Sequence, residues 1–186
     1  QMAAFLRELQ AVGAEVIAVR GDVTSPEDMT RALAETRARF GSVDTVIHAA
    51  GIINDALMAG KADGEAWDVL APKVHGTKAL IAALEGNPPK QTVLFASTST
   101  ASAPAGQVDY VAANEFLNAV ARAAPPALGR VVAVNWGVWA DTGMAARAMG
   151  TEAVPDPAPQ DPAAEADSGP MLGTEVAGGR GVRVQV

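Results

Sequence analysis

Five polar residues in the sequence have the types and the spacing needed to deliver a proton to a carbonyl oxygen. Tyr110 and Asn114 stand one helical turn apart in DYVAAN, so both side chains can face one cleft. Ser97 closes the apolar segment TVLFAS, and Lys73 opens KVHGTKALIAAL, whose apolar residues recur at helical intervals. The fifth residue is Asp55, in a loop that precedes that helix.

The chemistry indicated is carbonyl reduction, in which hydride attacks the carbon while an acid protonates the oxygen. A tyrosine can be that acid when a neighbouring lysine ammonium favours its phenolate and so lowers its pKa. A serine hydroxyl can hold the oxygen in place, and an asparagine can hold a water through which protons return. Taken singly, Tyr110 could be a core residue, Lys73 a surface charge and Ser97 a strand-end cap. Their combination favours catalysis.

The elements that must position these residues alternate between strand-like and helix-like patterns. Apolar stripes predict helices that end at Gly13 and Gly41, the second one capped by Thr24 or Ser25. We expect Pro72 to kink or restart the next helix, because proline cannot donate a hydrogen bond in a helix interior. The remaining segments are predicted as strands at 15–20, 43–50, 92–97 and 130–139, and as helices at 74–84 and 108–124. This alternation predicts an α/β fold with a parallel sheet covered by helices.

Three regions follow one another along the chain. Residues 1–150 carry the alternating pattern and are predicted to form the catalytic domain. Residues 151–170 are rich in proline, alanine and acids, a composition that indicates an extended linker. Residues 171–186 end on alternating valines and are predicted to begin a different, β-rich domain.

Composition excludes several classes of function. The 186 residues carry a net charge of −7, which argues against a nucleic-acid partner because phosphates require a basic surface. Cysteine is absent, and His48 and His75 lack ligand spacing, so we expect no metal site and interpret both histidines as structural. No apolar run reaches the roughly 20 residues that span a bilayer. We therefore expect a soluble, cytoplasmic protein without a membrane partner.

The sequence resembles the ketoreductase domains of modular polyketide synthases, a branch of the short-chain dehydrogenase/reductase superfamily. The resemblance runs from about residue 4 to residue 150 and rests on VIHAAG, APKVHGTKAL, VLFASTSTA, AGQVDYVAAN and VNWGVW. In most short-chain reductases the lysine follows the tyrosine by four positions. Here Asn114 holds that place and Lys73 lies upstream, which is the arrangement of the polyketide branch. The resemblance implies a Rossmann-like parallel sheet with helices on both faces.

The resemblance also assigns roles to the site residues. It implies that Tyr110 is the general acid, that Ser97 orients the β-keto oxygen, that Lys73 tunes the tyrosine and that Asn114 supports the proton relay. Asp55 matches the second acid of the Leu-Asp-Asp motif that marks the B stereochemical type, and it is expected to orient the substrate together with Met144. The expected NADPH contacts are Asp22 and Val23 at the adenine, Ala49, Ala50 and Gly51 along the cofactor, and Gly137 and Val138 beside the nicotinamide.

Some positions depart from the family pattern. The first strand and its Gly-rich turn, which would receive the pyrophosphate, are not found in the sequence, and GGRG near the C-terminus does not replace them because it follows no strand. We therefore expect a piece of a larger multifunctional chain. Ala105 replaces a proline common in the B type, and Asp109 replaces its asparagine. PMLGTEV resembles the opening of polyketide dehydratase domains, although Gly169 stands in place of their histidine. Tight packing is an alternative explanation for Ala49 and Ala50.

The implied function is NADPH-dependent reduction of a β-ketoacyl thioester. The substrate would be carried on the phosphopantetheine arm of an acyl carrier protein, beside neighbouring synthase domains. A catalytically silent structural segment of a synthase is the main alternative, and a free-standing fatty-acid-type reductase fits the Lys/Asn exchange and the proline-rich tail poorly.

Overall fold

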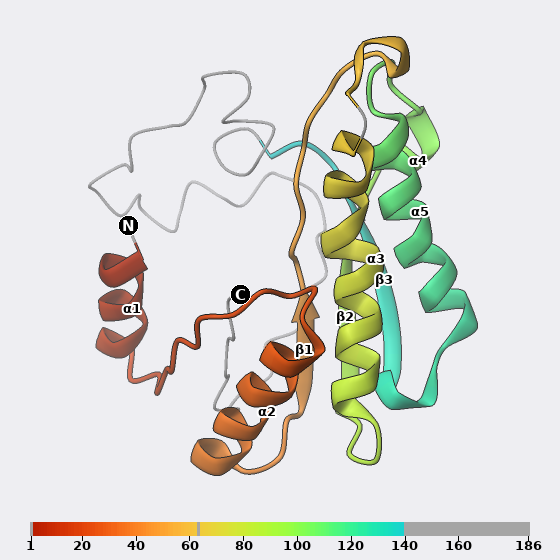
Figure 1. The fold of residues 1–186 in the computed structure, drawn as a ribbon. Coiled ribbons are helices and arrows are strands. Elements are labelled where there is room, and N and C mark those ends of the chain that lie inside the picture. The colour runs from red at the N-terminus through yellow and green to blue at the C-terminus, as the bar shows by residue number, and fades with distance from the viewer. Residues whose placement is uncertain (1, 63, 140–186) are drawn as a thin grey trace, which may run out of the picture. The chain divides into compact units, whose positions relative to one another are not determined.

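A parallel sheet lies at the centre of the part that the structure describes (Figure 1). The computed structural model describes residues 2–62 and 64–139, with side chains from residue 7 onward. Within these ranges three strands follow one another across the sheet in chain order: β1 (Thr45–His48), β2 (Gln91–Ser97) and β3 (Arg130–Trp136). Both pairings are parallel, and Ser97 lies opposite Trp136. The predicted α/β class with a parallel sheet is confirmed.

Helices connect and flank the strands. They are α1 (Met2–Ala11), α2 (Pro26–Phe40), α3 (Glu65–Leu84), α4 (Ser99–Ser102) and α5 (Val108–Ala123), with short 3-10 turns η1 (Met58–Gly60) and η2 (Pro126–Leu128). Of the two predicted caps for α2, Ser25 is the one used, because its hydroxyl accepts the N–H of Asp28 at 3.1 Å. Gly41 ends that helix with a positive φ of 84°, as its position predicted.

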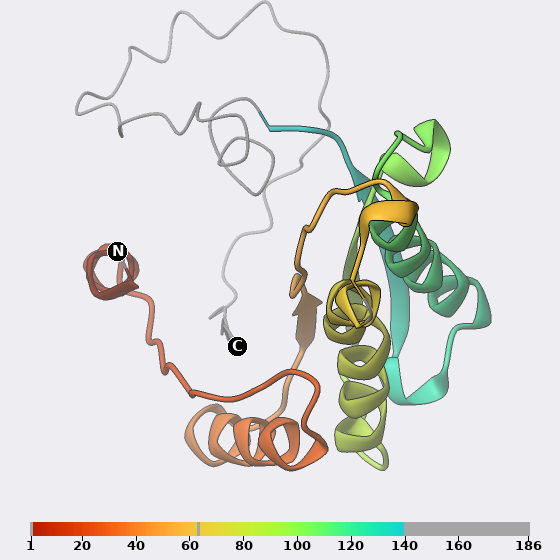
Figure 2. The same ribbon diagram turned by 45° about the horizontal axis from the view of Figure 1, so that its top comes forward.

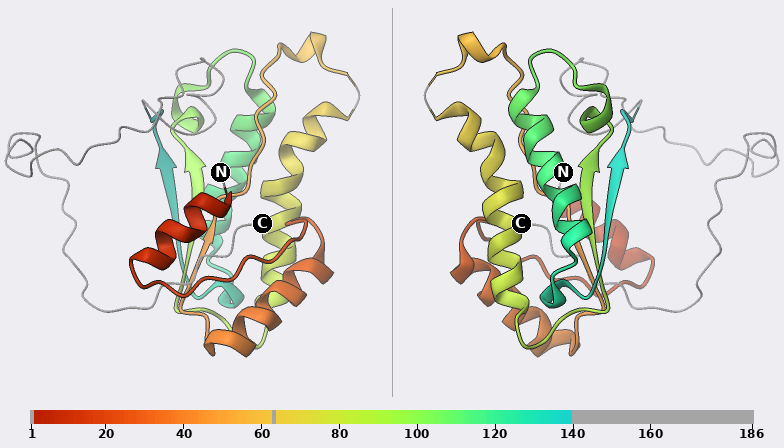
Figure 3. Two further views of the ribbon diagram at one scale, coloured as in Figure 1. Left: turned by 90° about the vertical axis from the view of Figure 1, so that its left-hand side faces the viewer. Right: turned by 90° about the vertical axis from the view of Figure 1, so that its right-hand side faces the viewer.

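The core lies between β2 and the helices α3 and α5, which stand side by side on one face of the sheet (Figure 3). Burial alternates along β2, so that Leu94 points into this layer and contributes to it with Leu84 of α3 and Leu117 of α5. Leu33 brings α2 into the same cluster, and Figure 2 shows α2 crossing near the end of α3. Burial of these leucines drives the packing that aligns α3 and α5 with β2.

The turn into β3 requires a glycine. Gly129 has a φ of +62°, and a side chain there would place its Cβ 2.1 Å from the carbonyl oxygen of Pro89. This close approach lets Arg130 N–H reach the carbonyl of Lys90 at 3.1 Å and start the pairing of β3 with β2. The register of the two strands therefore depends on the missing side chain.

One sequence prediction about the elements is wrong, and one of the two alternatives expected at Pro72 is excluded. Residues 15–20 form no strand, because no described residue provides a neighbouring strand for their backbone groups, and an apolar run alone does not make a ladder. The helix does not restart at Pro72 but continues through it from Glu65 to Leu84, with Pro72 buried in the packed layer. Here tertiary packing outweighs the lost backbone hydrogen bond.

The predicted catalytic domain, linker and following domain are described only in part. Residues up to Gly137 belong to one compact unit, while Val138 and Trp139 belong to a second. The linker predicted at 151–170 and the domain start predicted at 171–186 lie outside the described residues. Among the described helices, none is long and apolar enough to cross a membrane.

Candidate active site

Several of the predicted catalytic and cofactor residues lie at the carboxyl edge of the sheet. Ser97 is the last residue of β2, Ala49–Gly51 follow the end of β1, and Gly137 follows the end of β3. Because the strands are parallel and in register, these ends lie along one edge. The Thr98 N–H donates to the carbonyl of Trp136 at 3.0 Å and ties the ends of β2 and β3 together. Ligands of open parallel sheets bind at this edge.

Lys73 is held inside the protein, beside the strand that carries Ser97. Its side chain projects from α3, and Nζ donates to the carbonyl oxygen of Phe95 on β2 at 2.8 Å. Burial lowers the pKa of Lys73 to about 8, since the charged form is costly away from water. The ammonium of Lys73 therefore contacts β2 at Phe95, two positions before Ser97. Its burial also makes the ammonium a readier proton donor than a surface lysine.

Tyr110 and Asn114 occupy the first half of α5, one turn apart as predicted. Asn114 is fully buried, and its Nδ2 donates to the carbonyl oxygen of Tyr110 at 2.7 Å. Its Oδ1 is buried too and has no hydrogen-bond partner among the described residues. A buried amide oxygen of this kind is usually satisfied by a partner such as water. The Tyr110 side chain is partly buried.

The Ser97 hydroxyl has local partners. It donates to Ser99 Oγ at 3.0 Å and accepts the Ser99 N–H at 3.1 Å. Both bonds belong to the turn that starts α4, an element that the sequence pattern did not predict. Ser97 and Tyr110 are not joined by a hydrogen bond among the described residues.

His48 lies close to the buried lysine. It is the last residue of β1, and burial lowers its pKa to about 4, with the nearby positive charge of Lys73 as the second cause. The ring is therefore neutral near pH 7 and can pack against Lys73 without like-charge repulsion. The predicted structural role for His48 agrees with this burial. Among the described residues, no group of three or more acidic or histidine side chains could hold a metal ion.

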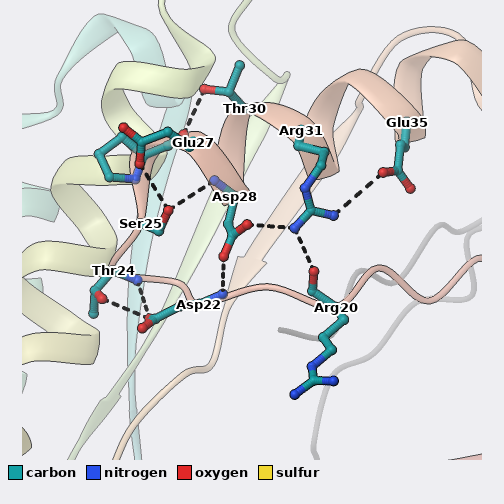
Figure 4. Close-up of polar contacts among 10 residues, drawn as sticks. Arg20, Asp22, Thr24, Ser25, Glu27, Asp28, Thr30, Arg31 and Glu35 are labelled. Carbon is teal, nitrogen blue, oxygen red and sulfur yellow. Dashed lines mark hydrogen bonds and ion pairs between the residues drawn. The ribbon is translucent and has the colours of Figure 1, made fainter.

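A network of hydrogen bonds shapes the loop that carries Asp22 and Val23 (Figure 4). Asp22 Oδ1 accepts both the N–H and the hydroxyl of Thr24 at 2.8 Å, and the Asp22 N–H donates to Asp28 Oδ2 at 2.8 Å. Arg31 of α2 pairs with Asp28 at 2.6 Å and donates to the carbonyl oxygen of Arg20 at 2.7 Å, which anchors the loop to α2. The bonds from Thr24 hold the pKa of Asp22 below its ordinary value, so this exposed carboxylate stays an acceptor.

The same loop packs next to the residues that follow β1. Val23 is buried in a cluster with Met29, and Ala50 packs against that cluster. A Cβ on Gly76 of α3 would lie 3.0 Å from a Val23 methyl, so the loop touches the helix backbone. Two predicted cofactor segments, which are far apart in the sequence, are thus brought together.

Comparison with known proteins now identifies the family. The KR domain matches residues 1–141. This chain belongs to the KR-domain family. Polyketide synthase PksN of Bacillus subtilis is 35% identical over 145 residues, which cover 75% of this chain and 3% of that synthase. The crystal structure of an N-terminal ketoreductase from the macrolactin assembly line has a TM-score of 0.70 and 31% identity, covering 74% of this chain and 29% of that one. A short-chain dehydrogenase/reductase from Brucella melitensis, 21% identical with a TM-score of 0.61, covers 72% of this chain and 58% of that one and shares the fold.

The match confirms the expected relationship of this KR-domain chain to modular polyketide synthases and its Rossmann-like, short-chain-reductase fold. The chain spans only 3% of the length of PksN and less than a third of the macrolactin ketoreductase chain. What the whole relatives do is therefore carried to this chain only as a proposal.

In the KR-domain chain, Asp55 has a partner that the sequence did not reveal. Gln107 Nε2 donates to Asp55 Oδ2 at 2.7 Å, which joins the loop after β1 to the start of α5. The buried ion pair of Lys61 with Asp109, next to Tyr110 in the chain, was not predicted either. One signal was available, since Lys61 is the only lysine or arginine between Arg39 and Lys73.

The last predicted residues lie at the end of the described region. Gly137 is exposed directly after β3, and a Cβ on it would meet no atom within 4 Å. Val138 is exposed and belongs to the second unit. The predicted substrate residue Met144 lies outside the described residues.

Proposed function

We propose that this chain forms the proton-delivering part of an NADPH-dependent β-ketoacyl reductase. The supporting observation is the burial of Lys73 and Asn114 on adjacent helices that meet the strand ending in Ser97. Two buried polar side chains at the carboxyl edge of a sheet are costly for stability, which favours a functional reason for keeping them.

Each catalytic residue has a task in the proposed reaction. The Tyr110 hydroxyl gives its proton to the β-keto oxygen as the carbon is reduced. Lys73, whose pKa is lowered to about 8, stabilises the phenolate that forms and returns a proton to it. Ser97 exchanges its bond to Ser99 for one to the substrate oxygen and orients it. Asn114 Oδ1, which lacks a described partner, accepts a hydrogen bond from a water that refills the relay.

The residues present fit NADPH at one end of its site. The ionised Asp22 can accept a hydrogen bond from the adenine amine, and Val23 offers an apolar surface to the ring. The small side chains of Ala49 and Ala50, with Gly51, permit close approach of the cofactor to the backbone after β1. Gly137 has open space around it after β3. When bound, NADPH supplies the hydride that reduces the carbon.

The proposed substrate is a β-ketoacyl chain on the phosphopantetheine arm of an acyl carrier protein. The support is the family, because the matching PksN is a polyketide synthase. The neighbouring domains of such a synthase are the proposed structural partners.

Replacing Tyr110 by Phe tests the proposal, because it removes one hydroxyl and little else. The experiment uses the complete ketoreductase domain that includes this chain, NADPH and a short β-ketoacyl thioester. We expect kcat to fall about a hundredfold or more, with the dissociation constant of NADPH little changed. Turnover that persists at the original rate in Tyr110→Phe would refute the assignment. Failure of the unsubstituted domain to bind NADPH would instead favour a silent structural segment.

Asn114 and Asn118 provide a matched pair on one helix. Asn114 is fully buried at the site, whereas Asn118 lies one turn further on and is partly exposed, bonded to Glu115. Asn114→Ala should lower kcat, while Asn118→Ala should leave it unchanged. Equal losses in the two variants would point to a general effect on α5.

A further inference from the structure

The connection from β1 to α3, which contains η1, buries its cation and exposes apolar side chains. Leu57 is 70% exposed and Met58 62% exposed, whereas the side chain of Lys61 is only 3% exposed. Loops normally show the opposite distribution, since an ammonium is far more costly to bury than a leucine is to expose. Polar links must therefore hold this loop in place.

The buried ammonium is satisfied by two groups. Lys61 Nζ lies 2.5 Å from Asp109 Oδ2, and it donates to the carbonyl oxygen of Asn54 at 2.5 Å. The Asp109 side chain is also 3% exposed, and its Oδ2 has no other hydrogen-bond partner among the described residues. Each charge is the counter-ion of the other, so removing one would leave a buried charge uncompensated.

Asp109 extends this link to the proposed general acid. Its second oxygen, Oδ1, accepts the backbone N–H of Tyr110 at 2.9 Å. The carboxylate therefore connects Tyr110 on one side with Lys61 on the other. We call Lys61 and Asp109 the buried clamp.

Two further bonds close a ring around the clamp. Gln107 Nε2 holds Asp55 Oδ2 at 2.7 Å, and the Ala56 N–H donates to the carbonyl of Gly106 at 3.0 Å. In Figure 1 the loop after β1 and the start of α5 run together at the top of the view. Asp55 and Tyr110, which come from different elements, are thereby held at a defined separation.

We propose that Lys61 and Asp109 are positioning residues that decide which face of the β-keto group receives the hydride. The proposal rests on the proposed function. Substrate held between Asp55 and Tyr110 presents one face to the cofactor only while their separation is maintained. Reactions of positioned groups are sensitive to shifts of about 1 Å. Neither member of the clamp has to touch the substrate for this effect.

The test uses the complete ketoreductase domain with Lys61→Met, Asp109→Asn and the double variant. The ratio of the two hydroxyl configurations is measured on a short β-ketoacyl thioester, together with kcat and KM. Each single variant should shift that ratio at least about fivefold and lower kcat about tenfold or more, because a misplacement of about 1 Å can cost a hundredfold. The double variant should recover much of both, since an asparagine amide can accept the Tyr110 N–H and no buried charge remains.

A matched control is the exposed ion pair of Lys90 with Asp44, in which Nζ lies 2.9 Å from Oδ1. The two side chains are 81% and 61% exposed. Lys90→Met should change neither the ratio nor kcat. Folded Lys61→Met and Asp109→Asn variants that keep the original hydroxyl ratio would overturn the proposal. So would a double variant whose losses simply add, because independent sites show no coupling.

Hydrogen exchange provides a readout that needs no turnover and remains available if a variant is poorly active. The Ala56 amide, which bonds to Gly106, should exchange faster in Lys61→Met than in the unsubstituted domain, while amides of β2 keep their protection. Unchanged exchange at Ala56 would show that the clamp does not hold the loop. Absence of product from the unsubstituted domain would overturn the proposed function and, with it, the effect on the hydroxyl ratio, while a faster exchange at Ala56 would still show that the clamp holds the loop.

Discussion

At the scale of single residues, the catalytic task proposed for Lys73 comes with a cost to the fold. The ammonium is buried between α3 and β2 with one carbonyl partner, Phe95. A solvated lysine does not carry the free-energy cost of desolvation, and Lys78 of the same helix is exposed. The fold therefore holds an ammonium where the proposed proton transfer needs it and loses stability in doing so.

Lys73→Met should stabilise the folded protein at pH 7 by about 2 kcal/mol. The unfolded chain keeps the lysine proton up to about pH 10.5, whereas the folded protein releases it near pH 8. Between these values the unfolded state binds more protons, so the free energy of unfolding rises with pH, by about 3 kcal/mol in all. The methionine variant should lack that rise. Its gain in stability at pH 7 is smaller than the rise by about 1 kcal/mol, because the hydrogen bond to Phe95 is lost. Urea unfolding from pH 7 to 10.5 measures it, with Lys78→Met as the control that should keep the slope.

The buried His48 makes the free energy of unfolding depend on pH in the acid range. Its pKa falls from 6.5 to about 4 on burial, so the unfolded chain takes up a proton that the folded protein refuses. Stability is complete above about pH 6.5 and is lost as the pH falls towards 4, by about 3 kcal/mol. His48→Gln should flatten this part of the urea-unfolding profile. His75→Gln, at an exposed position, should leave it unchanged; a flattening there would contradict the assignment.

At the scale of elements, α3 links both halves of the candidate site. It carries Lys73 on the face towards β2, and at Gly76 its backbone touches Val23 in the loop proposed to hold the adenine. Glycine is unfavourable inside a helix, so this close contact gives a reason for its presence. A shift of α3 would disturb the proposed proton transfer and the proposed cofactor binding together.

Gly76→Ala should therefore weaken NADPH binding while it preserves the helix. The new Cβ would lie 3.0 Å and 3.2 Å from the two Val23 methyls, so the loop must move by a few tenths of an ångström. Overpacking of this kind typically costs 1–3 kcal/mol, and we expect up to about a tenfold rise in the dissociation constant. Fluorescence titration of the complete domain with NADPH gives the value. Gly60→Ala, where no atom lies within 4 Å, serves as the control. Equal affinity in all three proteins would contradict the contact.

Sequence patterns predicted the elements where local spacing carries the information. Tyr110 and Asn114 fall on one face of α5 because a turn separates them, and Ser25 caps α2 as its residue type favours. Local patterns failed at residues 15–20, where a strand depends on a neighbour. They also missed the buried clamp, since only the folded loop brings Lys61 to Asp109.

At the scale of the whole molecule, the sheet is covered unevenly in the described part. Ile47, Val93 and Val132 lie side by side in register on the face opposite to Leu94. Ile47 is 48% exposed and Val132 is 37% exposed. Among the described strands, β1 also forms an edge. An apolar face next to an unpaired edge favours association between copies.

The 186-residue chain studied by itself should therefore self-associate as its concentration rises. Ile47→Lys places a charge on the exposed face and should shift the equilibrium towards the monomer. Sedimentation velocity over a range of concentrations would show the change in average mass. Val12→Lys adds the same charge at another exposed position and should have no effect. Association that is insensitive to Ile47→Lys would place the contact elsewhere.

The link between Lys61 and Asp109 also bears on how ketoreductases can be recombined. Lys61 and Asp109 come from two segments that are distant along the chain, and each charge compensates the other. The two segments should therefore be exchanged together. A graft that imports a foreign loop without a cation at position 61 would strand the carboxylate of Asp109 beside Tyr110. An exchange of this loop in the present chain should therefore transfer the start of α5 together with the loop.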